Sequence, residues 1–314
     1  MAFLALEKLS NCGQKPPLPL LYDWIGQTEL IKNRNILLNQ QCYEITKLFN
    51  GAGFLSCILK GQGNGLMYPE PLLRTPGDID IWVDGNRDEI KKFVLGKYPM
   101  AKDGPLHIAF QVADGIEVEA HYSAIRTSNP KYRRRVRTWI DDHKKKQFLH
   151  KVKLGDAEIC VPTTQFNVVY QMAHIMVHFF EEGIGLRHFV DYFFVLKTLH
   201  DDNCTESFES LFKQLGLLKL ARGVMWVEQE VLGMSDEYLI CEPDEKIGKV
   251  ILKEIEEGGN FGHHDKRYSL RNKGYLARGV ADGYRLIKLA RYFPQDAFWK
   301  IVSRIENQKW KLRL

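Results

Sequence analysis

Hydrophobic positions follow two different periods along this chain. Up to residue 161, short apolar or alternating runs predict strands over 54–59, 77–83, 107–112 and 116–122, and a second hairpin over 148–161. From residue 162 onward, apolar residues recur every three to four positions, which is the period of an α-helix. This spacing predicts helices over 165–180, 186–200, 205–215, 217–232, 244–257 and 272–292, and a last helix after residue 294. The predicted fold class is α+β, with a strand-containing domain over 1–161 and a helical domain over 162–314.

Helical segments are also expected within the strand-containing part. Residues 1–27 are proline-rich and predict an irregular lead-in, after which helical spacing runs from Thr28 to Phe49. A shorter helix is expected over 88–95, and an amphipathic one over 130–147. The polar face of this last helix is rich in Lys and Arg, which indicates either a solvated surface or a contact with a triphosphate or a polyanionic acceptor.

The segment Gly-Asp-Ile-Asp-Ile-Trp-Val at 77–83 alternates acidic and apolar residues. This is the period of a half-buried strand, so Ile79 and Ile81 should face one side and Asp78 and Asp80 the other. Adjacent carboxylates repel each other, so the pair indicates a cation between them. Hard oxygen ligands without a nearby cysteine favour Mg²⁺, with Mn²⁺ as the alternative ion. The competing interpretation is an ordinary solvated strand face.

A glycine-rich run, Lys-Gly-Gln-Gly-Asn-Gly at 60–65, directly follows the predicted strand 54–59. Glycines after a strand let backbone N–H groups approach phosphate oxygens, and Lys60 adds positive charge. The same glycines resemble a dinucleotide-binding fingerprint, which requires a crossover helix before the next strand. Three prolines between residues 69 and 76 leave no room for that helix, so we reject the dinucleotide hypothesis.

The strands 107–112 and 116–122 are separated by Ala-Asp-Gly, a strong hairpin signal. Glu117, Glu119 and His121 then share one face of the second strand. A third carboxylate beside Asp78 and Asp80 would complete a metal site of the kind that clamps a phosphoryl group. Glu117 and Glu119 are alternatives for this role, and His121 either orients a carboxylate or acceptor or is a hydrogen-bonded structural residue.

Composition excludes several classes of protein. The 314 residues are 45% hydrophobic and 26% charged, as in an ordinary globular protein large enough for two domains. The six cysteines are scattered without a C-x-x-C pair, so neither a zinc site nor a disulfide framework is predicted, and we expect a cytoplasmic protein. No apolar run approaches the length of about 18 residues that a membrane span needs, and the start of the chain does not look like a signal peptide. The net charge of +5 permits a phosphate-bearing partner without requiring one.

The order of these motifs resembles the DNA-polymerase-β-like nucleotidyltransferase superfamily. Leu-Lys-Gly at 59–61, Arg-x-Pro-Gly-Asp-Ile-Asp-Ile-x-Val at 74–83 and Glu-x-His-Tyr at 119–122 are similar to a branch of bacterial nucleotidyltransferases often associated with surface-polysaccharide gene clusters. The similarity extends to the segments HIMVHFF at 174–180 and LRHFVDYFFVL at 186–196. It implies a small mixed β-sheet as the nucleotidyltransferase core, followed by a helical domain that closes the cleft.

The resemblance also implies roles for individual residues. Asp78 and Asp80 would bind Mg²⁺ as metal ligands and catalytic residues, and Glu119 would be the third acidic ligand. Matching the family's acidic-x-His-aromatic motif favours Glu119 over Glu117. The nucleotide phosphates of an NTP substrate would be contacted by Lys60, Gly61, Gln62 and Arg74.

Some residues of the helical part are candidates with competing interpretations. His174 and His178 lie one turn apart, like a zinc pair, but residue 175 is Ile rather than the Glu of a zinc protease, so packed or hydrogen-bonded histidines are favoured. Arg187 and Asp191 are also one turn apart and form either an intrahelical salt bridge or part of the cleft. The glycine-rich stretch 258–265 is either a connector or a lid or acceptor loop.

Two classes of function are consistent with these features. An enzyme would transfer a nucleoside monophosphate from an NTP to a hydroxyl or phosphate and release pyrophosphate, in the manner of a Mg²⁺-dependent nucleotidyltransferase. A degenerate module would bind a nucleotide or RNA without turnover, and a toxin-like enzyme modifying RNA or protein is a further alternative. Lys60, both aspartates and a third carboxylate favour the enzyme, whereas no residue identifies the acceptor, which could be a small molecule, RNA or protein.

Overall fold

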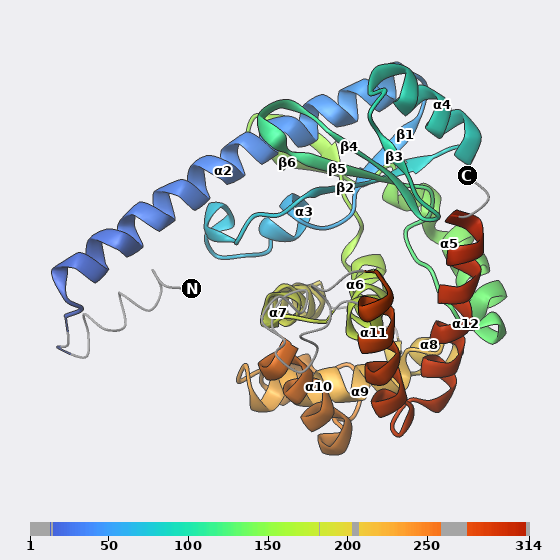
Figure 1. Ribbon diagram of the computed structural model, residues 1–314. Helices are drawn as coiled ribbons and strands as arrows, with labels where there is room; N and C mark the ends of the chain where they lie inside the picture. Colours follow the sequence, from blue (N-terminus) through green and yellow to red (C-terminus); the bar gives the residue numbers. More distant parts are fainter. Residues whose placement is uncertain (1–12, 14, 182, 203–206, 259–274, 312–314) are drawn as a thin grey trace. The chain divides into compact units, whose positions relative to one another are not determined.

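The computed structural model describes residues 13, 15–181, 183–202, 207–258 and 275–311 (Figure 1). The chain divides into two compact units. One, here called the sheet unit, comprises residues 1–123 and 146–162; the other, the helical unit, comprises residues 124–145 and 163–314.

The sheet unit contains a five-stranded sheet in the order β1-β2-β5-β4-β3. The strands are β1 Leu55–Ile58, β2 Ile79–Asp84, β3 Lys102–Asp103, β4 His107–Gln111 and β5 Glu117–His121. Only the β2–β5 pair is parallel; the other pairs are antiparallel, so the sheet is mixed and the α+β class is confirmed. Because β1 and β2 are antiparallel neighbours, the glycine-rich run does not open a parallel crossover unit, in agreement with the rejection of the dinucleotide-binding hypothesis. The short strand β3 has no apolar alternation and was not predicted.

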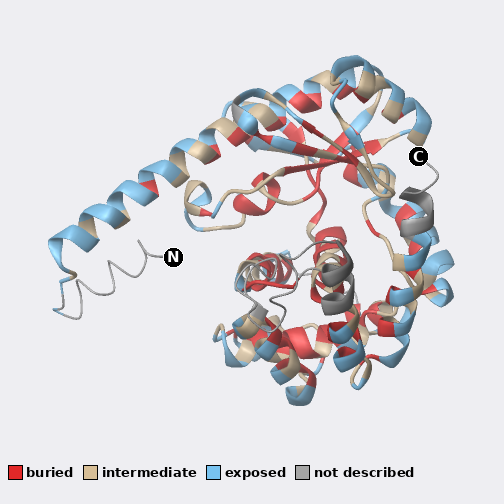
Figure 2. Ribbon diagram, viewed as in Figure 1, coloured by how far each residue is buried: buried red, intermediate tan, exposed pale blue. Residues whose placement is uncertain are grey.

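Helix α2 extends over Leu18–Gly51, ten residues further toward the N-terminus than the sequence pattern indicated. The expected irregular lead-in over 18–27 is therefore wrong. Its prolines do not prevent the helix, because Pro17 is the N-cap and the following proline lies in the first turn, where no intrahelical N–H donor is needed. Figure 2 shows buried positions concentrated toward the C-terminal half of this helix. There Leu38, Ile45 and Phe49 join the core formed with the sheet.

Strand β2 is buried on both faces, which corrects the expectation of a half-buried strand. Ile79 and Ile81 belong to the core against α2, with 2% and 0% of their surface exposed. On the opposite face Trp82 is 4% exposed and its ring lies 4.7 Å from that of Phe148. The acidic face of this strand is therefore an enclosed polar environment rather than a solvated surface.

The two hairpins and helix α4 agree with the predicted pattern, whereas the short helical turns between β1 and β2 were not predicted. The β4–β5 hairpin turns at the 3₁₀ segment η2 Ala113–Gly115, and α4 Arg87–Lys97 follows β2. A second two-stranded sheet pairs β6 Lys151–Leu154 with β7 Ala157–Cys160. The connection from β1 to β2 holds the four-residue helix α3 Gln62–Gly65 and the 3₁₀ turn η1 Pro71–Leu73.

The helical unit contains the long amphipathic helix α5 Pro130–Gln147, whose last two residues belong to the sheet unit. Its other helices are α6 Thr164–Glu181, α7 Leu186–Asp201, α8 Phe208–Leu215, α9 Leu218–Glu230, α10 Glu245–Gly258, α11 Tyr275–Ala290 and α12 Pro294–Lys311, with the 3₁₀ turn η3 Asp236–Tyr238. These match the predicted helices closely. The predicted loop over 258–265 lies outside the described residues except for Gly258, the last residue of α10. Among the described helices none is long and apolar enough to cross a membrane.

Candidate active site

Three carboxylates converge on the polar face of the sheet. Asp78 immediately precedes β2, Asp80 lies within it, and Glu119 lies on β5. Asp80 and Glu119 are direct partners in the parallel β2–β5 register, so both side chains project from the same face. One carboxylate oxygen from each of the three residues lies within 4.8 Å of the others.

Asp80 is held between two cations. Its Oδ2 lies 3.0 Å from Lys60 Nζ, and its Oδ1 lies 2.8 Å from His121 Nε2. Leu59 N–H donates to the Asp80 carbonyl oxygen at 3.0 Å, which fixes Lys60 beside this aspartate. Asp80 is only 2% exposed, so burial by itself would oppose its ionisation. The adjacent Lys60 and His121 nevertheless hold the pKa of Asp80 well below its ordinary value.

The two cations are stabilised in turn by the carboxylates. Burial tends to lower the pKa of Lys60, but the negative charges of Asp80 and Asp78 outweigh it and raise that pKa. Burial opposes the charge of His121 as well, yet hydrogen bonds to Asp80 and Glu119 raise its pKa to about 9. His121 is therefore an imidazolium at neutral pH, and its Nε2 donates to Asp80.

Asp78 is in a different electrostatic position. The charge of Asp80, followed by burial, raises the pKa of Asp78 above its ordinary value. Asp78 thus carries a repulsion that a bound cation would remove. A set of three hard carboxylate oxygens from Asp78, Asp80 and Glu119 fits Mg²⁺ or Mn²⁺ by the chemistry of its donors.

His107 belongs to this cluster and was missed by sequence reasoning. Its Nδ1 lies 3.4 Å from Glu119 Oε2, and its ring lies 5.1 Å from that of His121, its partner in the β4–β5 register. Burial lowers the pKa of His107, so this ring is the neutral one of the two. The signal was available, because a hairpin centred on residue 114 places 107 opposite 121. Glu117, by contrast, is exposed at the far end of β5.

The predicted phosphate-binding residues occupy different environments. Gly61 has φ +58°, in the left-handed region that favours glycine, and a Cβ at this position would lie 3.5 Å from the Asp78 carbonyl oxygen. The Gln62 side chain turns toward α2, where its amide donates to the Asn35 carbonyl oxygen at 3.3 Å. Arg74 is 5% exposed, and its guanidinium donates to the Thr75 carbonyl oxygen at 3.3 Å.

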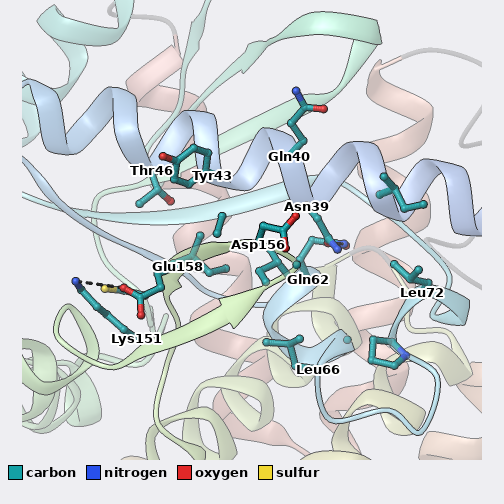
Figure 3. A pocket seen from close by; sticks show the side chains of 18 of the residues that line it. Asn39, Gln40, Tyr43, Thr46, Gln62, Leu66, Leu72, Lys151, Asp156 and Glu158 are labelled. Atoms are coloured by element: carbon teal, nitrogen blue, oxygen red, sulfur yellow. Dashed lines mark hydrogen bonds and ion pairs between the residues drawn. The ribbon is translucent and has the colours of Figure 1, made fainter.

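A pocket of about 1040 Å³ opens beside Gln62 within the sheet unit (Figure 3). Its walls come from α2, from the turn after β1 and from the β6–β7 hairpin, and they include the polar side chains of Asn39, Gln40, Thr46 and Glu158. Gln62 also bonds to the Asn39 side chain at the edge of this pocket. None of the three carboxylates is among the residues that line it.

The candidates on α7 belong to the helical unit. Arg187 is partly exposed and Asp191 is 6% exposed. Their participation in a nucleotide site stays a prediction. His174 and His178 lie on α6, where the structure brings a third histidine to them.

A family model and a solved structure match this chain. The model of a family described as "uncharacterised nucleotidyltransferase" matches residues 1–233. The chain belongs to this family. No curated protein matches the chain. Among solved structures, an antigenic nucleotidyltransferase-like protein from Paracoccidioides brasiliensis matches with a TM-score of 0.38 and 12% identity, over 69% of this chain and 95% of that one. The matched segment contains the carboxylate cluster and the predicted phosphate-binding residues Lys60, Gly61, Gln62 and Arg74.

Proposed function

We propose that this family member transfers a nucleoside monophosphate from an NTP to a hydroxyl or phosphate acceptor and releases pyrophosphate. The observation that carries the proposal is the meeting of Asp78, Asp80 and Glu119 on one sheet face, with ligand oxygens within 4.8 Å, in a chain of a nucleotidyltransferase family. Nucleotidyl transfer needs positioning and charge neutralisation more than covalent chemistry from the protein. A cluster of carboxylates beside a lysine, with Asp80 buried and Asp78 and Glu119 partly exposed, suits that requirement.

In this proposal the three carboxylates hold Mg²⁺, or Mn²⁺ in its place. The bound ions would supply positive charge to the triphosphate and to the reacting oxygens. Asp78 gains most from a cation, because Asp80 already has Lys60 and His121 as partners whereas the pKa of Asp78 is raised by repulsion. His121 acts by holding Asp80 in its ionised form and in one orientation.

Lys60, Gly61, Gln62 and Arg74 are proposed to bind the nucleotide. Lys60 has the charge and the position, 3.0 Å from Asp80, to contact a phosphate oxygen next to the metal ligands. Gly61 brings the backbone close to Asp78, whereas the Gln62 side chain is engaged with α2, so we assign the backbone N–H of Gln62 rather than its amide to this contact. Arg74 supplies a further positive charge, and a cytoplasmic location would provide both NTP and Mg²⁺.

Binding and turnover can be measured before the acceptor is known. We expect Mg²⁺ and an NTP together to raise the melting temperature more than either alone, and we expect pyrophosphate release when a small-molecule or RNA extract supplies acceptors. Asp78→Asn should abolish both effects, whereas Glu117→Gln is the matched control, because Glu117 lies on the same strand as Glu119 but is exposed. Nucleotide-dependent stabilisation without pyrophosphate from any extract would favour a binding module over the enzyme.

A further inference from the structure

Three histidines converge within the helical unit. His174 and His178 are one turn apart on α6, and His188 lies in the first turn of α7. One ring nitrogen from each lies within 4.8 Å of the other two. The ring centroids are 4.3 Å apart for His174 and His178, 4.8 Å for His178 and His188, and 5.6 Å for His174 and His188.

Two of the ring nitrogens are close neighbours, and a backbone carbonyl holds the third ring. His174 Nε2 and His178 Nε2 are 3.0 Å apart. His188 Nδ1 lies 3.2 Å from the Gly185 carbonyl oxygen, which can only accept, so Nδ1 carries the proton and Nε2 keeps its lone pair. A hydrogen bond from the second ring nitrogen to a carbonyl is the usual support of a metal-binding histidine, because it fixes both the tautomer and the ring orientation.

The spacing suits a small transition-metal ion. Zinc binds imidazole nitrogen at about 2.0–2.1 Å, so tetrahedral ligands lie roughly 3.3 Å from one another. The histidine nitrogens in this cluster lie between 3.0 Å and 4.8 Å apart. Side-chain movements of about an ångström would bring them to tetrahedral ligand spacing. Neutral imidazoles bind zinc and its neighbours in the first transition row, whereas Mg²⁺ prefers oxygen ligands.

From the sequence alone a metal site at His174 and His178 was disfavoured, and the structure adds the missing third histidine. A His-x-x-x-His pair alone is incomplete, and Ile175 excludes the glutamate base of a zinc protease. His188 supplies the third ligand from the neighbouring helix. His174 and His178 are partly exposed, which gives an ion a route of entry, while His188 is 7% exposed.

We propose that His174, His178 and His188 form a site for one zinc-class divalent ion, with the fourth position left to water or to an anionic ligand. This site is chemically distinct from the carboxylate cluster. Three histidines with an open position match the ligand number of zinc sites that bind a further molecule rather than closed structural sites.

The test uses the full chain without a histidine tag, stripped of metal with a chelator and titrated with Co²⁺ and Zn²⁺. We expect one Co²⁺ per chain with the visible absorption of a tetrahedral nitrogen site, displaced by stoichiometric Zn²⁺ and unaffected by excess Mg²⁺. His178→Gln and His188→Gln should each weaken binding more than tenfold. His200→Gln is the matched control, because His200 is exposed at the end of α7.

Two further variants keep the result unambiguous. Far-UV circular dichroism checks that each glutamine variant is folded. If His178→Gln or His188→Gln does not fold, His174→Gln, at a partly exposed position, is tested in its place. A double variant, Asp78→Asn with Asp80→Asn, should retain the Co²⁺ spectrum. Three results would overturn the proposal. Zinc binding could survive the loss of all three histidines, it could disappear with the two aspartates, or it could be absent from the wild-type chain.

Discussion

Replacing Asp78 or Asp80 by asparagine should have opposite effects on stability in metal-free buffer, although the two residues are neighbours on one face. Asparagine preserves the shape of the side chain and removes the charge. At Asp80 that charge is the shared partner of Lys60 and His121, at 3.0 Å and 2.8 Å. At Asp78 the charge is opposed by that of Asp80, which raises the pKa of Asp78.

The magnitudes follow from these contacts. Hydrogen bonds to charged groups contribute about 1.5–3 kcal/mol each, and removing one partner of a buried ion pair costs about 3–5 kcal/mol. Lys60 keeps 18% of its side chain exposed and can turn partly toward water, so we take the lower end, about 3 kcal/mol lost for Asp80→Asn. Asp78→Asn should gain up to about 1 kcal/mol, the range of a single charge pair near a surface.

The assay is urea-induced unfolding at pH 7 with a chelator present, followed by circular dichroism and by tryptophan fluorescence, to which the buried Trp82 of β2 contributes. A second series contains saturating Mg²⁺, which should stabilise the wild-type protein and neither variant. Equal stability of the two variants without metal, or greater loss for Asp78→Asn, would refute the electrostatic assignment. Mg²⁺ stabilisation that persists in both variants would show that the ion binds elsewhere.

Three other predictions follow from the described contacts. Glu119→Gln should reduce turnover by orders of magnitude, whereas Glu117→Gln should change it little, as measured by pyrophosphate release. Lys60→Ala should raise KM for the NTP as well as lower kcat, since it removes a phosphate contact and an Asp80 partner. Glu228, fully buried on α9, has no hydrogen-bond partner for either carboxyl oxygen among the described residues, and burial raises its pKa well above the ordinary value. In the folded protein Glu228 keeps a proton that it loses in the unfolded chain. The free energy of unfolding should therefore fall as pH rises above the ordinary carboxyl pKa, by up to about 1.4 kcal/mol per pH unit. Urea titrations at pH 5 to 8 should show this dependence in the wild-type protein and not in Glu228→Gln.

The strand 77–83 shows how far periodicity alone determines a site. Strict alternation was enough to place Asp78 and Asp80 on one face and Ile79 and Ile81 in the core. It could not show that β2 lies parallel to β5, because strand order depends on long-range packing and not on local pattern. The strand faces left Glu117 and Glu119 as alternatives for the third carboxylate, and only the resemblance to a family favoured Glu119.

Other features were missed for identifiable reasons. The prolines near the start of α2 suggest an irregular segment by composition alone, but they occupy the N-cap and the first turn, where a helix tolerates them. His107 has no local motif around it, and only the register of its hairpin places it opposite His121. The third histidine beside His174 lies on the next helix, and the angle at which two helices pack cannot be taken from the period of either one.

The fate of each phosphate of the NTP tests the central proposal most directly. NTPs labelled at either the α or the γ phosphorus are incubated with Mg²⁺, the protein and an acceptor extract. The proposed reaction moves the α label to the acceptor, releases the γ label as pyrophosphate, and stops in Asp80→Asn. Transfer of the γ label to the acceptor, or α transfer that continues unchanged in Asp80→Asn, would contradict nucleotidyl transfer at this carboxylate cluster.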